Sequence, residues 1–193
     1  MSYDEHNLIE IICGPMFAGK TEKIIEIFKK LKKLNKKVLV FKSKLDIRFS
    51  KKQELVSHNL NTINSFVIEK SKEILDFIKI DTEIIIIDEV QFLDNQIVDI
   101  VDYLANKNIK SIIAGLDLDF RGKPFGPMPF LLSIADKVTK LKSICSISGQ
   151  PANRTQRLIN QKPAINSEPI IMTEDNEIVK YEPRNRKYHE FKK

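Results

Sequence analysis

The stretch that decides the fold reads Gly14-Pro15-Met16-Phe17-Ala18-Gly19-Lys20-Thr21. It fits the phosphate-loop pattern of a glycine, four further residues and Gly-Lys-Thr. In such a loop the glycines let the backbone N–H groups point inward around phosphate oxygens. We expect Lys20 to bridge the β- and γ-phosphates of ATP and Thr21 to ligate Mg²⁺. The sequence therefore predicts a nucleotide site lined by the whole loop.

The segments on either side of this loop have the pattern that a phosphate loop requires. Residues Leu8–Cys13 form an apolar run, which is typical of a buried strand. After Thr21, apolar residues recur at helical spacing as far as Leu34, and Asn35 ends the helix. The helix adds its positive dipole end to the phosphate site. A strand before the loop and a helix after it argue against a chance match.

The other half of such a site follows the run of four isoleucines at Ile84–Ile87. β-Branched residues in succession favour a strand buried on both faces. Asp88 at its end is expected to hold Mg²⁺ through the water shell of the ion. Glu89 comes next, where a carboxylate can accept a proton from an attacking hydroxyl or orient a water. The competing interpretation of Glu89 is a solvent-exposed loop carboxylate.

The rest of the chain alternates strands with helices. We expect further strands at Val38–Phe41, Ile63–Phe66, Ser111–Ala114 and Lys137–Leu141, and helices at Ser71–Ile78, Asp94–Leu104 and Phe130–Ala135. We expect a long functional loop at Lys42–Asn61. This order predicts an α/β fold with a parallel sheet flanked by helices, as in RecA-like P-loop NTPases. The pattern stops after Lys142, which predicts a P-loop nucleotide-binding domain over residues 1–142 and a small irregular lobe over 143–193.

Composition narrows the class of protein. The 193 residues are 42% hydrophobic and 30% charged, an ordinary globular balance. We see no apolar run of the roughly 18 residues that span a bilayer and no signal peptide, so we expect a cytoplasmic protein without membrane contact. Two cysteines, Cys13 and Cys145, make a disulfide framework improbable. The net charge of +6 lies partly on one lysine-rich helix without interleaved aromatic residues, so we expect no nucleic-acid partner.

The phosphate loop and several later segments together resemble the cytosolic, type II thymidine kinase family. The later segments are Asp46–Arg48 with Ser57-His58, Ile87–Phe92, Gly115–Phe125, Ala135–Leu141, Pro151-Ala152 with Arg154–Arg157, and Tyr181-Glu182. The resemblance implies transfer of the γ-phosphoryl group of ATP to the 5′-hydroxyl of thymidine. Deoxyuridine is an expected second acceptor, because one methyl group is worth only about 1–3 kcal/mol of discrimination. A homotetramer and inhibition by thymidine triphosphate (dTTP) are also implied.

The resemblance also implies roles for individual residues. Glu89 matches the catalytic base, Arg48 the arginine beside the transferred phosphoryl group, and Asp46 a residue that orders its loop. Gln91 is placed at the bound nucleotide. The nucleoside pocket is implied at Met16, Phe17, Phe92, Leu116, Phe120 and Phe125, with Tyr181 in a C-terminal lasso. Leu116 could equally be an ordinary core residue. The stretch Ile171–Asn176 departs from the family's lasso sequence.

The family usually carries a structural zinc, which this chain lacks the residues to hold. Cys145 keeps the first ligand of the first pair, but Ser148 replaces the second. Asn185 and Tyr188 occupy the second pair, and His189 stands one position too late. Structural zinc needs four thiolate or imidazole ligands in a tetrahedron. We therefore expect no zinc, and a lobe held by packing and hydrogen bonds or ordered by bound nucleoside.

Two other functions remain open at this point. A nucleic-acid-stimulated ATPase would suit the basic charge and the Asp88–Glu89 pair, although the chain lacks a second motor lobe and an aromatic–basic surface. A family member that binds nucleotide without turnover would suit the lost zinc ligands. The intact Lys20, Thr21, Asp88 and Glu89 argue against this third reading.

Overall fold

The computed structural model describes residues 8–45, 54–56, 62–170 and 179–191. Its centre is a six-stranded sheet in the order β5-β2-β6-β7-β1-β8, in which every neighbouring pair is parallel. In that order the strands are Phe66–Ile68, Val38–Ser43, Ile84–Asp88, Lys110–Gly115, Ile9–Cys13 and Lys137–Lys140. The expected parallel α/β fold is confirmed.

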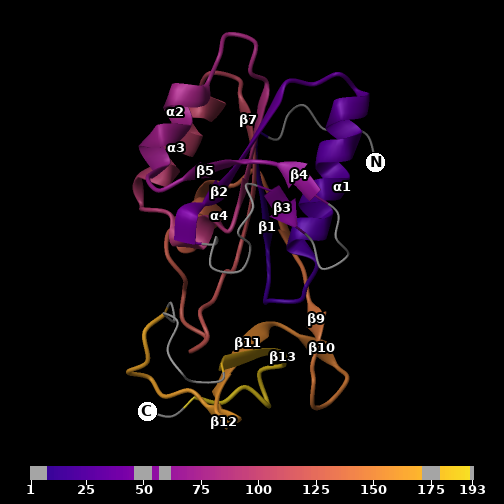
Figure 1. Ribbon diagram of the computed structural model, residues 1–193, viewed down its shortest axis with the longest axis vertical. Coiled ribbons are helices and arrows are strands. Elements are labelled where there is room, and N and C mark those ends of the chain that lie inside the picture. The colour runs from indigo at the N-terminus through magenta and orange to yellow at the C-terminus, as the bar shows by residue number, and fades with distance from the viewer. Residues whose placement is uncertain (1–7, 46–53, 57–61, 171–178, 192–193) are drawn as a thin grey trace.

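Helices cover both faces of this sheet (Figure 1). Helix α1, Lys20–Lys33, packs on one face. Short α2, Ile74–Phe77, lies on the opposite face with α3, Gln96–Ala105, and α4, Met128–Ile134. Each face therefore has its own apolar layer.

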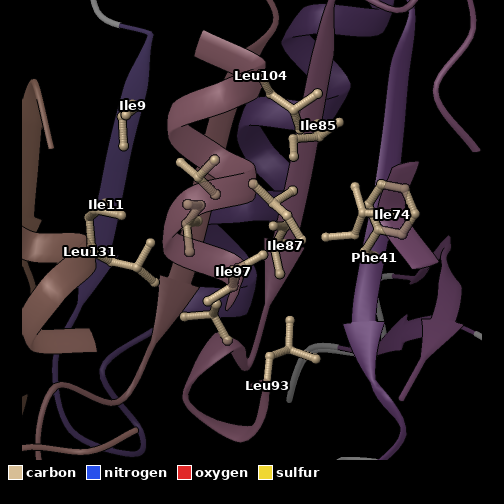
Figure 2. Close-up of a cluster of buried hydrophobic side chains, with 14 of the residues drawn as sticks. Ile9, Ile11, Phe41, Ile74, Ile85, Ile87, Leu93, Ile97, Leu104 and Leu131 are labelled. Atoms are coloured by element: carbon tan, nitrogen blue, oxygen red, sulfur yellow. The ribbon is translucent and has the colours of Figure 1, made fainter. Parts of the chain in front are cut away.

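The isoleucine run of β6 shows how the sequence divides between these two layers. Ile85 and Ile87 belong to the cluster under α2, α3 and α4, which Figure 2 shows. Ile84 and Ile86 belong to the cluster under α1. All four are fully buried, because successive side chains of a strand point to opposite faces and both faces are covered.

The edge of the sheet that carries the candidate site follows from the strand order. Strands β1 and β6 are separated by β7, and all three run in the same direction. Their carboxyl ends therefore meet at one edge, where the phosphate loop, Asp88 and the loop after Gly115 emerge. The topology brings together segments that are about 70 to 100 residues apart in the sequence.

The C-terminal lobe contains short strands where the sequence had indicated irregular structure. Strands β9, Ser143–Ile144, and β10, Pro151–Ala152, form one antiparallel pair. A three-stranded antiparallel sheet joins β12, β11 and β13, which are Lys162–Pro163, Arg154–Ile159 and Val179–Arg184. In Figure 1 these strands form a layer beyond one end of the main sheet. Strands of two residues are too short to show a period of hydrophobicity.

Two local expectations were wrong. The strand expected at Ile63–Phe66 is two strands, because Thr62–Asn64 (β4) pairs with Glu54–Val56 (β3) while Phe66–Ile68 (β5) pairs with β2. Strand β3 lies inside the segment expected to be a loop. The strand with which each segment pairs, and not the pattern of its own three residues, decides where these strands form.

The helix expected at Ser71–Ile78 consists of two short elements, a 3₁₀ turn followed by α2. The 3₁₀ turn Ser71–Glu73 (η2) begins after Lys70, whose N–H donates to the Glu73 carboxylate at 2.8 Å. The Ser71 N–H instead donates to Asp94 Oδ2 at 3.0 Å, near the start of α3. The contact between Ser71 and Asp94 therefore helps to fix where this turn begins. No helix in the described part of the chain is long and apolar enough to cross a membrane.

Candidate active site

The phosphate loop joins the end of β1 to the start of α1. Its backbone passes through positive φ at Gly14 (144°), Phe17 (63°) and Gly19 (80°). A Cβ on Gly14 would lie 2.5 Å from the carbonyl oxygen of Leu141, so only glycine fits there. Lys20 is buried, and its Nζ donates to the carbonyl of Pro15 at 2.9 Å. The lysine therefore lies folded over the loop that it is expected to serve.

Thr21 and Asp88, the two residues expected at Mg²⁺, are in contact. The Thr21 hydroxyl donates to Asp88 Oδ2 at 3.0 Å. Asp88 is itself buried at the end of β6. A hydroxyl and a carboxylate are oxygen ligands of the kind Mg²⁺ prefers, and in P-loop sites they hold the ion with the phosphates. The residues present therefore fit the ion.

Glu89 is held by its neighbours in an uncommon backbone conformation. Its φ is 54°, in the left-handed region, and its N–H donates to Asp88 Oδ1 at 3.0 Å. Its carboxylate oxygen Oε2 accepts a hydrogen bond from Gln91 Nε2 at 2.5 Å. Gln91 Oε1 in turn accepts the Leu116 N–H at 3.0 Å. A chain of hydrogen bonds thus runs from Thr21 and Asp88, the residues expected to hold Mg²⁺, to the loop after β7.

Gln91 is buried, and glycines make the space for it. A Cβ on Gly115 would lie 2.7 Å from Gln91 Oε1, and one on Gly126 would lie 2.2 Å from the Gln91 carbonyl oxygen. Sequence reasoning placed Gln91 at the nucleotide. The structure brings its amide to Glu89 and Leu116, which links the expected base to the expected nucleoside wall.

The loop after β7 carries three residues of the expected nucleoside pocket. Leu116, Phe120 and Phe125 are largely buried, and the ring of Phe125 meets that of Phe92 edge to face at 5.5 Å. Asp119 folds the loop, since its Oδ1 accepts the N–H groups of Arg121 and Lys123. Apolar and aromatic walls of this kind suit a flat base.

The other residues expected in the nucleoside pocket come from the phosphate loop and the C-terminal lobe. The Met16 N–H donates to Thr155 Oγ1 at 3.0 Å, and the Phe17 carbonyl accepts the Ser143 hydroxyl at 3.0 Å. Phe17 is 44% exposed, so its ring is not a core residue. Tyr181 lies on β13 and contacts the guanidinium of Arg157. Asp46 and Arg48 lie outside the described residues.

Three residues at this site received no role from the sequence. Thr155 binds the phosphate loop, Arg157 contacts Phe120 and Tyr181, and His189 Nε2 lies 2.8 Å from the Phe120 carbonyl oxygen. Burial lowers the pKa of His189, although hydrogen bonds with the Phe120 and Thr155 carbonyls oppose the shift. The one signal in the sequence was that Thr155 and Arg157 lie in a segment shared with the family.

The positions that correspond to the zinc ligands of the family meet through hydrogen bonds. Asn185 Nδ2 donates to the Ser148 hydroxyl at 3.0 Å, and Asn185 Oδ1 accepts the Tyr188 N–H at 3.2 Å. Burial raises the pKa of the Cys145 thiol, but hydrogen bonds from the Ser148 hydroxyl and from the backbone N–H groups of Asn185, Ser148 and Ile147 outweigh it and lower the pKa to about 7. Within the described ranges no three His, Cys, Asp or Glu side chains gather as a metal site. This donor set does not fit structural zinc.

Comparison with known proteins gives matches along almost the whole chain. The thymidine kinase family model matches residues 7–186. The thymidine kinase of Onion yellows phytoplasma (strain OY-M) is 61% identical over 181 residues, which are 94% of this chain and 86% of that protein. The thymidine kinase of Aster yellows witches'-broom phytoplasma (strain AYWB) has the same identity and coverage. These matches span both the phosphate loop and the C-terminal lobe.

Proposed function

Because the chain belongs to the thymidine kinase family and phosphorylates thymidine with ATP, we propose that Glu89 is its catalytic base. The supporting observation is the run of hydrogen bonds from Thr21 through Asp88, Glu89 and Gln91 to Leu116. These hydrogen bonds support the proposal, because they would hold the Glu89 carboxylate between the expected phosphate site and the loop after β7. A base must lie within hydrogen-bond reach of the hydroxyl that it deprotonates.

In this mechanism the 5′-oxygen of thymidine attacks the γ-phosphorus of ATP. The new O–P bond forms as the bond to the β,γ-bridging oxygen breaks, ADP leaves, and Glu89 takes the hydroxyl proton. Lys20 would leave the Pro15 carbonyl and neutralise charge on the β- and γ-phosphates. Arg48 would act on the same charge. Mg²⁺, when bound by Thr21 and Asp88, would neutralise the developing charge on the phosphates.

The acceptor pocket that we propose combines the two parts of the chain. Phe92, Leu116, Phe120 and Phe125 would form the walls from the kinase domain, residues 1–142, with Met16 and Phe17 from the phosphate loop. Tyr181 would close it from the lobe, residues 143–193. The burial of Leu116, Phe120 and Phe125 supports the assignment, as does the hydrogen bond from the Leu116 N–H to Gln91. Deoxyuridine should also be accepted, because the pocket would lose only one methyl contact.

The test offers thymidine, deoxyuridine, deoxycytidine and deoxyadenosine separately to the wild type and to Glu89→Gln, with ATP and Mg²⁺. We expect thymidine monophosphate to form in step with ADP, and Glu89→Gln to lower turnover roughly 100-fold or more while ATP binding persists. Asp81→Asn, an exposed carboxylate at the opposite end of β6, is the matched control. ATP hydrolysis stimulated by DNA and not by thymidine would contradict the proposal.

We also propose that the lobe folds without zinc. The support is the contact between Ser148 and Asn185, which joins the two turns that would carry zinc ligands. Elemental analysis of chelator-washed, active protein should find no stoichiometric zinc. Asn185→Ala should lower the free energy of unfolding by about 0.5–1.5 kcal/mol, because the hydrogen bonds to the Ser148 hydroxyl and from the Tyr188 N–H are lost. Stoichiometric zinc, or activity lost to the chelator and restored by zinc, would overturn this.

Three further properties are proposed on the family's example alone. They are a homotetrameric assembly, inhibition by dTTP and a cytoplasmic location. Size-exclusion chromatography with light scattering tests the first. Inhibition that falls as thymidine rises would support binding of dTTP at the acceptor site.

A further inference from the structure

Arg157 is a buried cation at the junction of three chain segments. It lies on β11, opposite Tyr181 of β13, and its side chain belongs to a residue that is only 2% exposed. The guanidinium carbon lies 4.0 Å from the centre of the Phe120 ring and 5.4 Å from that of Tyr181. The two terminal nitrogens donate to the carbonyls of Pro169 and Ile170. One side chain therefore joins the loop after β7, strand β13 and the segment after β12.

A purely structural role explains this residue poorly. Within the described ranges Arg157 forms no ion pair with a carboxylate, and its Nε has no hydrogen-bond acceptor. Burying a charge without an ionic partner is unfavourable, and apolar residues of similar volume often stabilise a core as well or better. What arginine supplies and an apolar residue cannot is a planar fork that donates two hydrogen bonds while its faces stack on rings.

The neighbours of Arg157 are the residues expected to hold the base. Phe120 and Tyr181 are both pocket residues, one from each part of the chain. The Phe120 carbonyl is also bonded to His189, so the ring and the backbone of this residue are fixed separately. Thr155, two positions before Arg157 on β11, binds the N–H of Met16 in the phosphate loop. Strand β11 thus connects the nucleoside wall to the phosphate loop.

We propose that Arg157 is a positioning residue for the nucleoside: its contacts with the Phe120 and Tyr181 rings hold these two side chains, one from each part of the chain, in place as walls for the base. The inference rests on the proposed function. Arg157 touches neither the phosphate loop residues Lys20 and Thr21 nor the Glu89 chain of hydrogen bonds in any contact described above. Its loss should therefore act on thymidine and leave ATP binding and the chemical step largely intact.

The test compares steady-state kinetics of Arg157→Met and Arg157→Lys with the wild type. Arg157→Met keeps the length and loses the donors, so KM for thymidine should rise roughly 10-fold or more, while KM for ATP and kcat stay within about 3-fold. Arg157→Lys keeps the charge without the planar fork, so it should rescue little. Lys162→Met, an exposed cation on the neighbouring strand β12, is the control and should behave as the wild type.

Equal changes in both KM values, or full rescue by lysine, would overturn the positioning role. If Arg157→Met does not fold, the test uses Arg157→Lys and Phe120→Leu and measures how much each substrate raises the melting temperature. The proposal requires that thymidine raise the melting temperature of these variants less than that of the wild type, and that ATP raise it equally. A wild type that fails to phosphorylate thymidine would instead refute the proposed function, whereas an active wild type with unaffected Arg157 variants refutes only this inference.

Discussion

Gln91 donates to the Glu89 carboxylate at 2.5 Å and accepts the Leu116 N–H at 3.0 Å. Its amide can serve both partners only in one orientation, because the nitrogen must face the carboxylate and the oxygen the N–H. A surface carboxylate is usually free to rotate. Here a buried amide, packed against Gly115, selects one rotamer of the expected base.

Gln91→Met should therefore lower kcat by roughly 10-fold or more, because methionine keeps the volume and removes both hydrogen bonds. KM for ATP should stay close to that of the wild type. Gln96→Met, at an exposed glutamine at the start of α3, is the matched control. Steady-state kinetics check this, and a rise in KM for ATP at constant kcat would favour nucleotide binding by Gln91 instead.

His189 gives the molecule a pH dependence with a defined sign. Burial lowers its pKa below the ordinary value of about 6.5, so the folded protein favours the neutral ring. The stability that comes from keeping this ring neutral is fully present above about pH 6.5, the ordinary pKa that applies in the unfolded chain. It is lost as the pH falls through the lowered pKa of the folded protein. Positive Arg154 opposes protonation and Asp119 favours it.

The melting temperature should therefore fall between pH 7.5 and pH 5.5, and His189→Gln should show a shallower fall. Glutamine can still donate to the Phe120 carbonyl, so its stability at pH 7.5 should change little. Thermal unfolding across this range measures both. An identical slope in the variant would assign the pH dependence to other groups, among them Cys145 with its pKa of about 7.

Candidate site residues could be proposed from the sequence where the expected chemistry lies within one short segment. Lys20 and Thr21 follow from the spacing of one loop, and Asp88 follows from its place after an apolar strand. Thr155, Arg157 and His189 could not be found in this way. Thr155 meets Met16 across 139 positions of sequence, and His189 meets Phe120 across 69. No local pattern records such distant contacts.

At the scale of elements, strands that are buried on both faces were predictable and short paired strands were not. The run Ile84–Ile87 has enough β-branched residues to specify β6 alone. Strands β3 and β4 have three residues each and exist because they pair with one another. The same holds for β9 and β10, so the lobe was interpreted as irregular.

The turn before α4 offers a direct test of how closely two loops pack. Gly126 has φ of 50°, and an added Cβ would lie 2.2 Å from the carbonyl oxygen of Gln91. Gly149 has a similar φ of 67° with nothing within 4 Å of its Cβ position. Both changes to alanine strain the backbone, but only the first creates a clash.

Gly149→Ala should cost about 1 kcal/mol of unfolding free energy from backbone conformation alone. Gly126→Ala should cost at least about 1 kcal/mol more, since overpacking adds to the same strain. It should also lower kcat, because Gln91 must move. Urea unfolding with activity assays checks both variants. Equal losses in the two would mean that the loop accommodates the methyl group.

At the scale of the whole molecule, the described residues of 143–191 contact the rest of the chain around the proposed nucleoside pocket. The contacts Thr155–Met16, Ser143–Phe17 and His189–Phe120 all lie around the proposed pocket. A nucleoside bound there would contact both parts and would tie them together. ATP in the phosphate loop would engage mainly the domain.

Thymidine should therefore slow hydrogen exchange in β11 and β13, while an ATP analogue should slow it mainly in the phosphate loop and the first turn of α1. Hydrogen-exchange mass spectrometry with each ligand alone distinguishes the two patterns. An acyclic alcohol that carries no base serves as the control. Protection by thymidine confined to Gly14–Thr21 would contradict a pocket shared by both parts.

The position of β1 in the sheet also bears on how the protein is made. Its two partners are β7 and β8, and neither exists until the ribosome has passed Lys110. At about 5–20 residues per second, the strand before the phosphate loop would wait on the order of 5–20 s with its edges unpaired. Residues Ile9, Ile11 and Ile12 would be exposed during that interval. Newly made chains are therefore vulnerable to aggregation from their N-terminal end, until late synthesis completes the sheet.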